Sequence, residues 1–224
     1  MNSLARPLAL LALAALPLAT HAAATEQRYR IDLIVFLDRN SAAGELPQPA
    51  TVPDVSKALE PLDAAHLKDA GIELVPEEHF GLNEQWQRLR NSRRLEPLLK
   101  LAWIQKDPPA DHGPAIHVRW GNALPLNTGS GSSAIYPLDG TLSLLASRYL
   151  HLDADLAYTQ PGPDGTPVSY RLKEKRRMKR DELHHLDSPR VGILVRVEKA
   201  DKAEKPKPVP APKPAPKKKV PVKR

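Results

Sequence analysis

Residues 29–37 read YRIDLIVFL, and this stretch decides the class of fold. Successive side chains of a β-strand point to opposite sides, so the alternating positions from Tyr29 to Leu37 would form one fully apolar face. The other face begins polar, at Arg30 and Asp32, and ends apolar, at Ile34 and Phe36. The stretch therefore predicts a strand with one face in the core and a second face of mixed character.

Six further runs predict strands by the same alternation or by their apolar content. They are residues 98–105, 116–120, 138–144, 150–158, 168–172 and 191–197. In the run 116–120 we expect Ile116, Val118 and Trp120 to point inward, and His117 and Arg119 to point outward. The tryptophans of the chain, Trp86 and Trp103 included, all lie on apolar faces and are expected in the core.

The segments between these runs predict short turns and few helices. Residues 160–167 contain Asp164-Gly165, a dipeptide suited to positive φ, so the flanking runs should pair as an antiparallel hairpin. Residues 82–92 and 62–70 have helical patterns, whereas 40–61 and 127–134 (NTGSGSSA) are expected to be loops. We predict one α+β domain, a mostly antiparallel sheet with one or two helices packed on it.

The first 24 residues predict a secretory signal peptide. Arg6 is followed by the apolar run 8–19 (LALLALAALPLA), and small residues allow cleavage after Ala22 or Ala24. The run is shorter than the roughly 20 apolar residues that a membrane-spanning helix needs. We therefore expect an exported protein without a transmembrane anchor after cleavage.

A basic, proline-rich tail follows the predicted domain, which spans residues 25–198. Residues 199–224 hold ten basic and two acidic side chains, a net charge of +8, whereas the domain holds 22 and 24, a net charge of −2. Such a composition is typical of disordered or polyproline II segments. Outside the cytoplasm its partners would be anionic wall polymer, anionic lipid or an acidic protein rather than nucleic acid, unless it is only a solvated tail.

Motifs for catalysis or cofactors are missing from the sequence. There is no cysteine, no H-E-x-x-H, no G-x-S-x-G, no S-x-x-K and no P-loop. The stretch 129–134 (GSGSSA) fits a dinucleotide fingerprint only superficially, because a strand rather than a helix is expected after it. We predict no cofactor and no enzymatic activity.

Two clusters are candidates for binding. The first, residues 182–187 (ELHHLD), suggests either a metal site or a hydrogen-bonded corner before the last strand. An extended chain would bring His185 and Asp187 to one face, so a metal would need a third ligand, such as His151. The second, residues 173–180 (KEKRRMKR), is either a ligand patch or a solvated face paired with Asp153 and Asp155.

Taken in order, several segments resemble the CsiV family of bacterial peptidoglycan-binding proteins. They are residues 29–36 (YRIDLIVF), 102–105 (AWIQ), 138–142 (LDGTL), 148–152 (RYLHL), 176–189 (RRMKRDELHHLDSP) and 192–195 (GILV). The resemblance covers about residues 28–198. It implies a periplasmic, non-catalytic protein of a Gram-negative cell that associates with peptidoglycan. It also implies a supporting role in cell-wall synthesis through lipoprotein activators of penicillin-binding synthases.

The matching segments and the clusters together supply the candidate residues for a ligand or partner. They are Arg148, Tyr149, His151, Arg176, Arg177, Glu182, His184, His185 and Asp187. Two alternatives stay open. One is a protein-interaction adaptor without direct wall binding, and the other is a metal-dependent hydrolase built on His151, His184, His185 and Asp187.

Overall fold

The computed structural model describes residues 26–40, 47–128 and 131–200. The predicted signal peptide and nearly all of the basic tail lie outside these ranges. Within them, no helix is long and apolar enough to cross a membrane.

The strands form two five-stranded sheets in which every strand pairing is antiparallel. The first sheet has the order β11 (Leu183–Asp187), β12 (Val191–Lys199), β1 (Arg28–Asp38), β4 (Leu95–Lys106) and β3 (Ile72–Leu74). The second has the order β2 (Gln48–Pro49), β10 (Pro167–Met178), β9 (Leu150–Pro161), β8 (Leu138–Ala146) and β5 (Ile116–Trp120). The predicted α+β class with mostly antiparallel strands is confirmed, and the strands divide into two sheets rather than one.

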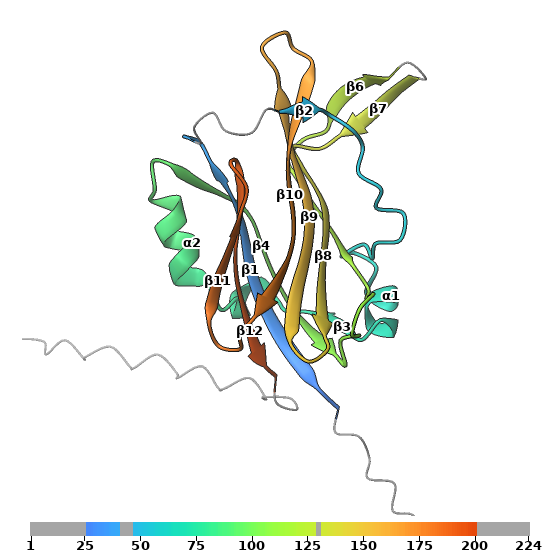
Figure 1. Cartoon of the computed structure of the whole chain (residues 1–224), viewed down its shortest axis with the longest axis vertical. Coiled ribbons are helices and arrows are strands. Elements are labelled where there is room, and N and C mark those ends of the chain that lie inside the picture. The colour runs from blue at the N-terminus through green and yellow to red at the C-terminus, as the bar shows by residue number, and fades with distance from the viewer. Residues whose placement is uncertain (1–25, 41–46, 129–130, 201–224) are drawn as a thin grey trace, which may run out of the picture.

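A separate two-stranded ribbon, β6 (Leu124–Thr128) with β7 (Gly131–Ile135), extends from the second sheet (Figure 1). The prediction that residues 127–134 form a loop is therefore wrong for all but residues 129–130, which lie outside the described ranges. Glycine and serine are poor strand formers, but here the backbone hydrogen bonds to β6 hold the segment extended.

The two sheets pack face to face, and their inner faces share one hydrophobic core. β1 contributes Ile31, Leu33 and Val35, and the second sheet contributes Leu142 from β8 and Leu152 from β9, all fully buried. Two antiparallel sheets that bury one face each against the other form a core about 10 Å thick. The alternation in residues 29–37 is thus explained by this shared core.

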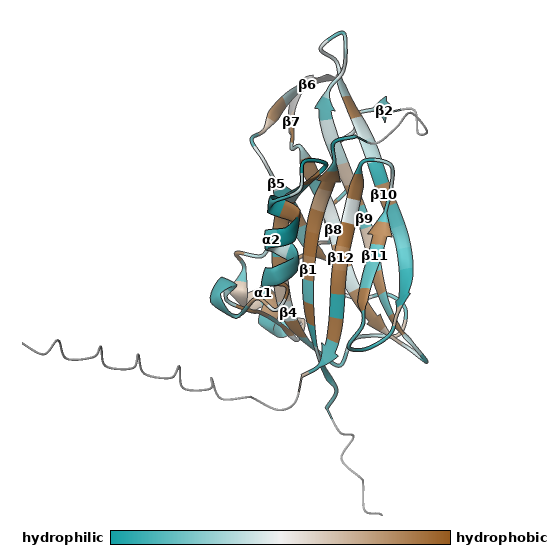
Figure 2. Cartoon of the chain, turned by 90° about the vertical axis from the view of Figure 1, so that its left-hand side faces the viewer, coloured by the Kyte–Doolittle hydropathy of each residue, from teal (hydrophilic) through white to brown (hydrophobic). Residues whose placement is uncertain are grey.

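The outer face of β1 is covered as well, by the short helix α2 (Asn83–Arg90) and the segment before it (Figure 1). Ile34 and Phe36 form a second cluster there with Phe80, Leu82 and Leu89. Figure 2 shows β1 apolar along most of its length and β10 largely hydrophilic. The predicted helix 82–92 is confirmed, as is one within 62–70, α1 (Ala64–Asp69), whose side-chain cap is Asp63. A one-turn 3-10 helix, η1 (Glu77–His79), precedes α2.

One carboxylate is fully buried beneath this outer cover. Asp32 pairs with Arg30 at 2.9 Å and accepts a hydrogen bond from the Gly81 backbone at 2.6 Å. Arg196, its neighbour on β12, donates to the carbonyl of Gly81 at 3.3 Å. The polar start of the outer face of β1 therefore fixes the segment that leads into α2.

The prediction for 116–120 is right for the strand and for the outward direction of His117, but wrong for the burial of Trp120. His117 lies on the outer face but is only 3% exposed, because the segment around Leu59 runs alongside β5 and covers it. Its two ring nitrogens bond to Glu60 at 2.6 Å and to Asp139 at 2.7 Å. Trp120 is 36% exposed at the end of the strand, so it is not a core residue.

The hairpin predicted around Asp164-Gly165 is confirmed as β9–β10, and Gly165 has a φ of 82°. Asp155 pairs across the strands with Arg171 at 2.6 Å and with Lys173 at 3.2 Å. The hydrogen bond from Arg171 lowers the pKa of the Asp155 carboxyl. The positive charge of Lys173, within the basic run 173–180, is thus partly neutralised on the solvated face, as expected for cross-strand pairs.

Replacing Gly192 with alanine should lower the free energy of unfolding by about 1–3 kcal/mol, the usual cost of overpacking. A Cβ at this position would lie 2.2 Å from the Phe36 ring, which crosses the glycine to stack on His185 at 5.6 Å between ring centroids. Urea unfolding of Gly192→Ala, Phe36→Leu and the double variant measures the coupling. If Gly192→Ala lowers the free energy of unfolding equally in the wild-type protein and in Phe36→Leu, the Phe36 ring is not the cause of the destabilisation.

Replacing Asp32 with alanine should cost about 3–5 kcal/mol, because it leaves Arg30 without its partner beneath the cover of α2. Asp153→Ala is the matched control, since this aspartate lies on the solvated face of β9 and should change stability by less than about 0.5 kcal/mol. Chemical denaturation of both variants compares the costs. Equal costs would contradict the structural role of Asp32.

Candidate functional site

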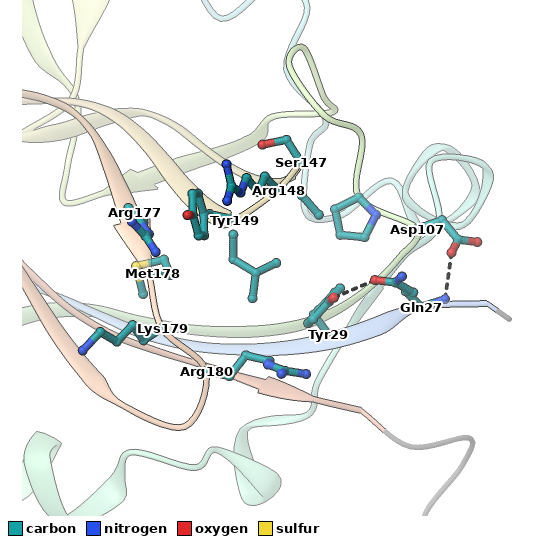
Figure 3. A pocket seen from close by; sticks show the side chains of 13 residues that line it. Gln27, Tyr29, Asp107, Ser147, Arg148, Tyr149, Arg177, Met178, Lys179 and Arg180 are labelled. Carbon is teal, nitrogen blue, oxygen red and sulfur yellow. Dashed lines mark hydrogen bonds between the residues drawn. The ribbon is translucent and has the colours of Figure 1, made fainter.

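A pocket of about 750 Å³ opens at the end of the sandwich where β1 begins (Figure 3). Four segments form it: the start of β1, the residues after β4, the β8–β9 turn and the end of β10 with the turn that follows. We call it the cationic pocket. Its residues are Gln27, Tyr29, Asp107, Pro108, Ala146, Ser147, Arg148, Tyr149, Leu150, Arg177, Met178, Lys179 and Arg180.

Tyr149 and two arginines form one side of the cationic pocket. The Arg177 guanidinium carbon lies 3.3 Å from the centroid of the Tyr149 ring, and that of Arg148 lies 5.5 Å from it. A guanidinium over an aromatic face is held by cation–π attraction while its N–H groups stay available at the edge. Tyr149 is 39% exposed, so the group is accessible from solvent.

The arginines of the pocket have no carboxylate partner within the part of the chain that the structure describes. Arg148, Arg177 and Arg180 form no ion pair there, and Lys179 pairs with Glu182 only at 3.5 Å. Four positive side chains around one concavity raise the local concentration of anions. The pocket is therefore an anion-attracting site.

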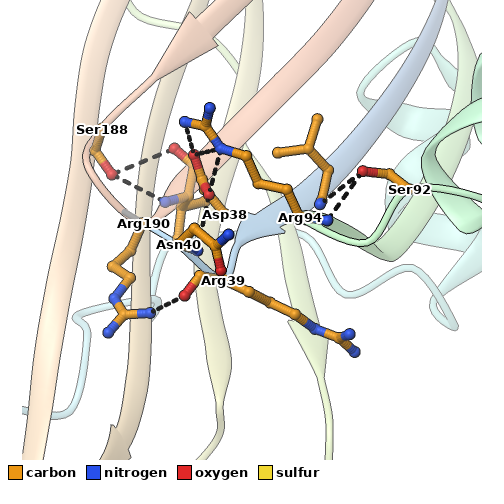
Figure 4. Close-up of polar contacts among 9 residues, drawn as sticks. Asp38, Arg39, Asn40, Ser92, Arg94, Ser188 and Arg190 are labelled. Atoms are coloured by element: carbon orange, nitrogen blue, oxygen red, sulfur yellow. Dashed lines mark hydrogen bonds and ion pairs between the residues drawn. The ribbon is translucent and has the colours of Figure 1, made fainter. Parts of the chain in front are cut away.

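Arginines at the other end of β1 are arranged differently (Figure 4). Arg94 donates two hydrogen bonds to Asp38 at 2.9 Å, which lowers the pKa of that carboxyl, and Arg39 pairs with Glu96 at 2.8 Å. Arg190 donates to the carbonyl of Arg39 at 3.4 Å and lies over the ring of Tyr170. These arginines close a corner of the fold, whereas those of the cationic pocket do not.

The opposite side of the pocket is polar but less charged. The Tyr29 hydroxyl donates to the Gln27 side chain at 2.7 Å, and the backbone N–H of Gln27 donates to Asp107 Oδ1 at 2.8 Å. Figure 3 shows Asp107 on the far side of the pocket from Arg177. Asp107 has a φ of 42° at the end of β4, which turns the chain back toward Gln27. The pocket thus has a cationic side and one carboxylate across from it.

Three of the predicted candidates meet in this pocket: Arg148, Tyr149 and Arg177. His151 follows on β9 and pairs across strands with Arg177, but it does not line the pocket. Arg176 points to the other side of β10, where it donates to the carbonyl of His185 at 3.1 Å and pairs with Glu174 at 2.9 Å. Arg176 therefore links β10 to β11, at the edges of the two sheets.

The remaining candidates lie on β11 or in the turn before it. The backbone N–H of Lys179 donates to His184 Nε2 at 3.0 Å, which fixes the turn that carries Lys179 and Arg180. His185 stacks on Phe36 on the outer face, and Asp187 lies exposed on that same face. Glu182 contacts Lys179. The corner is hydrogen-bonded, and it positions the pocket without entering it.

The metal alternative required His151, His184, His185 and Asp187 to converge. His184 and His185 point to opposite faces of β11, and His151 belongs to the other sheet. Among the described residues, no group of three or more histidine, cysteine, aspartate or glutamate side chains is placed to hold a metal ion.

The sequence did not single out Gln27, Tyr29 or Asp107 as site residues. Gln27 and Asp107 are 80 positions apart and meet because β1 and β4 are neighbours. Lys179 and Arg180 belong to the basic run 173–180, which the sequence analysis named as a possible ligand patch. This run was the feature of the sequence that pointed to them.

Residues 4–200 match the family model described as peptidoglycan-binding protein, CsiV. No curated protein and no solved structure matches the chain. The family match covers all of the described residues, those of the pocket included. The chain belongs to the CsiV family of peptidoglycan-binding proteins.

Proposed function

We propose that this protein is a periplasmic, non-catalytic component that attaches to peptidoglycan through the cationic pocket and supports the regulation of wall synthesis. Membership of a peptidoglycan-binding family and the signal-peptide pattern of residues 1–24 support this proposal. The machinery it serves would be penicillin-binding synthases with their lipoprotein activators. In the mature chain, a domain of about residues 25–198 would bind the wall, followed by the basic tail 199–224.

The observation that carries the proposal is the group of cations without carboxylate partners, within the described ranges, around Tyr149. Wall peptides bear carboxylates, and an arginine fork matches a carboxylate with two parallel hydrogen bonds. Such bonds to charged groups contribute about 1.5–3 kcal/mol each. The cationic pocket therefore has the chemistry that a wall contact needs.

The basic tail starts from the same end of the domain. The backbone N–H of Ala200 donates to the carbonyl of Arg28, and Arg28 follows Gln27 of the pocket. Positive charge from the tail would add to the field of the pocket and attract the anionic polymer at longer range. The tail would then raise the affinity without deciding which ligand is bound.

Replacing Arg148 and Arg177 together with alanine should reduce retention on protein-free sacculi at least tenfold, because two charge-assisted contacts are lost. Arg119→Ala is the matched control, since Arg119 lies over the ring of Tyr136 at 4.3 Å, beside the opposite end of β8. Co-sedimentation of the full mature protein measures retention, and unchanged melting temperatures show that both variants fold.

Full retention of the double variant would place the wall contact elsewhere on the molecule. Failure of the wild-type protein to sediment with sacculi would favour the alternative of an adaptor that reaches the wall through a partner.

Removing residues 201–224 should flatten the dependence of sacculus binding on salt concentration. The deleted segment carries nine basic and two acidic side chains, and exposed charges are screened beyond about 10 Å at 0.1 M salt. A full-length variant with those nine side chains changed to glutamine should behave like the deletion. Identical salt dependence with and without the tail would show that the tail does not contact the polymer.

A further inference from the structure

We infer that the cationic pocket recognises the peptide stems of the wall rather than its sugar strands, and that it selects a stem with both free carboxylates and an ammonium group. This inference rests on the wall contact proposed above. It specifies which part of the polymer is bound and in which direction that part lies in the pocket.

The position of Tyr149 argues against a sugar platform. A tyrosine that stacks on a sugar ring presents an open aromatic face. Here the guanidinium of Arg177 covers one face of the Tyr149 ring, with its carbon 3.3 Å from the centroid, and Arg148 lies 5.5 Å from the same centroid. The ring instead holds in place two arginines that both line the pocket.

The charges of the pocket argue for carboxylates. In the intact polymer the sugar strands present hydroxyl and acetamido groups and carry no formal charge, whereas the peptide stems carry free carboxylates. Arg148, Arg177 and Arg180 lie in the pocket without ion pairs to any described residue, and Lys179 adds a fourth cation. A neutral ligand would leave these charges uncompensated, but a stem would pair with them. The volume of about 750 Å³ is within the range of about 300–1,000 Å³ typical of small-ligand pockets.

Asp107 supplies the second half of the selection. One of its oxygens accepts the backbone N–H of Gln27 at 2.8 Å, and Lys106 beside it pairs with Glu26 at 2.8 Å. The carboxylate is exposed and stands across the pocket from Arg177 (Figure 3). An ammonium group on the stem would meet Asp107 when the carboxylates meet the arginines. The pocket therefore matches a ligand with charges of both signs, held in one direction.

The test uses soluble tetrapeptide stems with one free amine on the diamino acid, titrated calorimetrically into the full mature protein. We expect saturable binding, a loss of at least tenfold when the carboxylates are amidated, and a loss of several-fold when the amine is acetylated. Arg148→Ala with Arg177→Ala should abolish binding, and Arg119→Ala should not change it. Asp107→Asn, which keeps the acceptor for Gln27, should bind the free and acetylated stems equally well.

Sugar strands freed of their stems by an amidase, with the lactyl carboxylates that this exposes then amidated and the strands coupled to beads, separate this inference from the proposed function. Pocket-dependent retention on the bare sugar strands would overturn the inference and leave the wall contact in place. Stem binding that survives loss of both arginines, or capture by anionic lipid vesicles instead of stems, would overturn it as well. Pocket-dependent stem binding without retention on sacculi would support the ligand chemistry and count against the proposed wall association.

Discussion

The burial of β1 on both faces is the constraint on which the rest of this structure depends. Its inner side chains join the core between the sheets, and its outer ones lie under α2 and the preceding segment. Because β12 and β4 flank it, the strand has no free edge, and its backbone is paired on both sides within one sheet. This arrangement places two requirements on the sequence. Asp32 is buried and must therefore be paired, and residue 192 must be glycine because a larger side chain would leave no room for Phe36.

Local alternation predicted most of the strands, because the period of two is imposed by a buried face whatever the order of strands in the sheet. The division into two sheets was not predictable, since it depends on pairings between distant segments, such as β1 with β12. His117 shows the same limit: its place on the outer face followed from the pattern, but its burial comes from the distant segment at Leu59. Arg148, Tyr149 and Arg177 were candidates from the sequence, whereas Asp107 and Gln27 become neighbours only when β4 lies beside β1.

The arginines of this protein serve two different purposes. At the Asp38 corner and on the outer face of β9–β10, guanidinium groups are held by carboxylates, and their contribution is to the geometry of the fold. In the cationic pocket they are held by a tyrosine ring, which positions a charge without neutralising it. Arg119 over Tyr136 and Arg190 over Tyr170 have the same support singly, so the pocket is distinguished by the gathering of several cations around one concavity. The hydrogen bond from Lys179 to His184 shows that β11 contributes to recognition by shaping the turn.

The placement of the pocket at the end where β1 begins and β12 finishes also affects how the molecule approaches its target. Residues 25–198 are close to neutral, with a net charge of −2, yet four cations without strong partners among the described residues line the pocket, and the basic sequence 199–224 follows from the same end. The charge of this end is therefore more positive than that of the domain as a whole. Near a negatively charged network the field turns it before any contact forms, so that the pocket arrives first and the ribbon of β6 and β7 trails behind, facing the surrounding fluid.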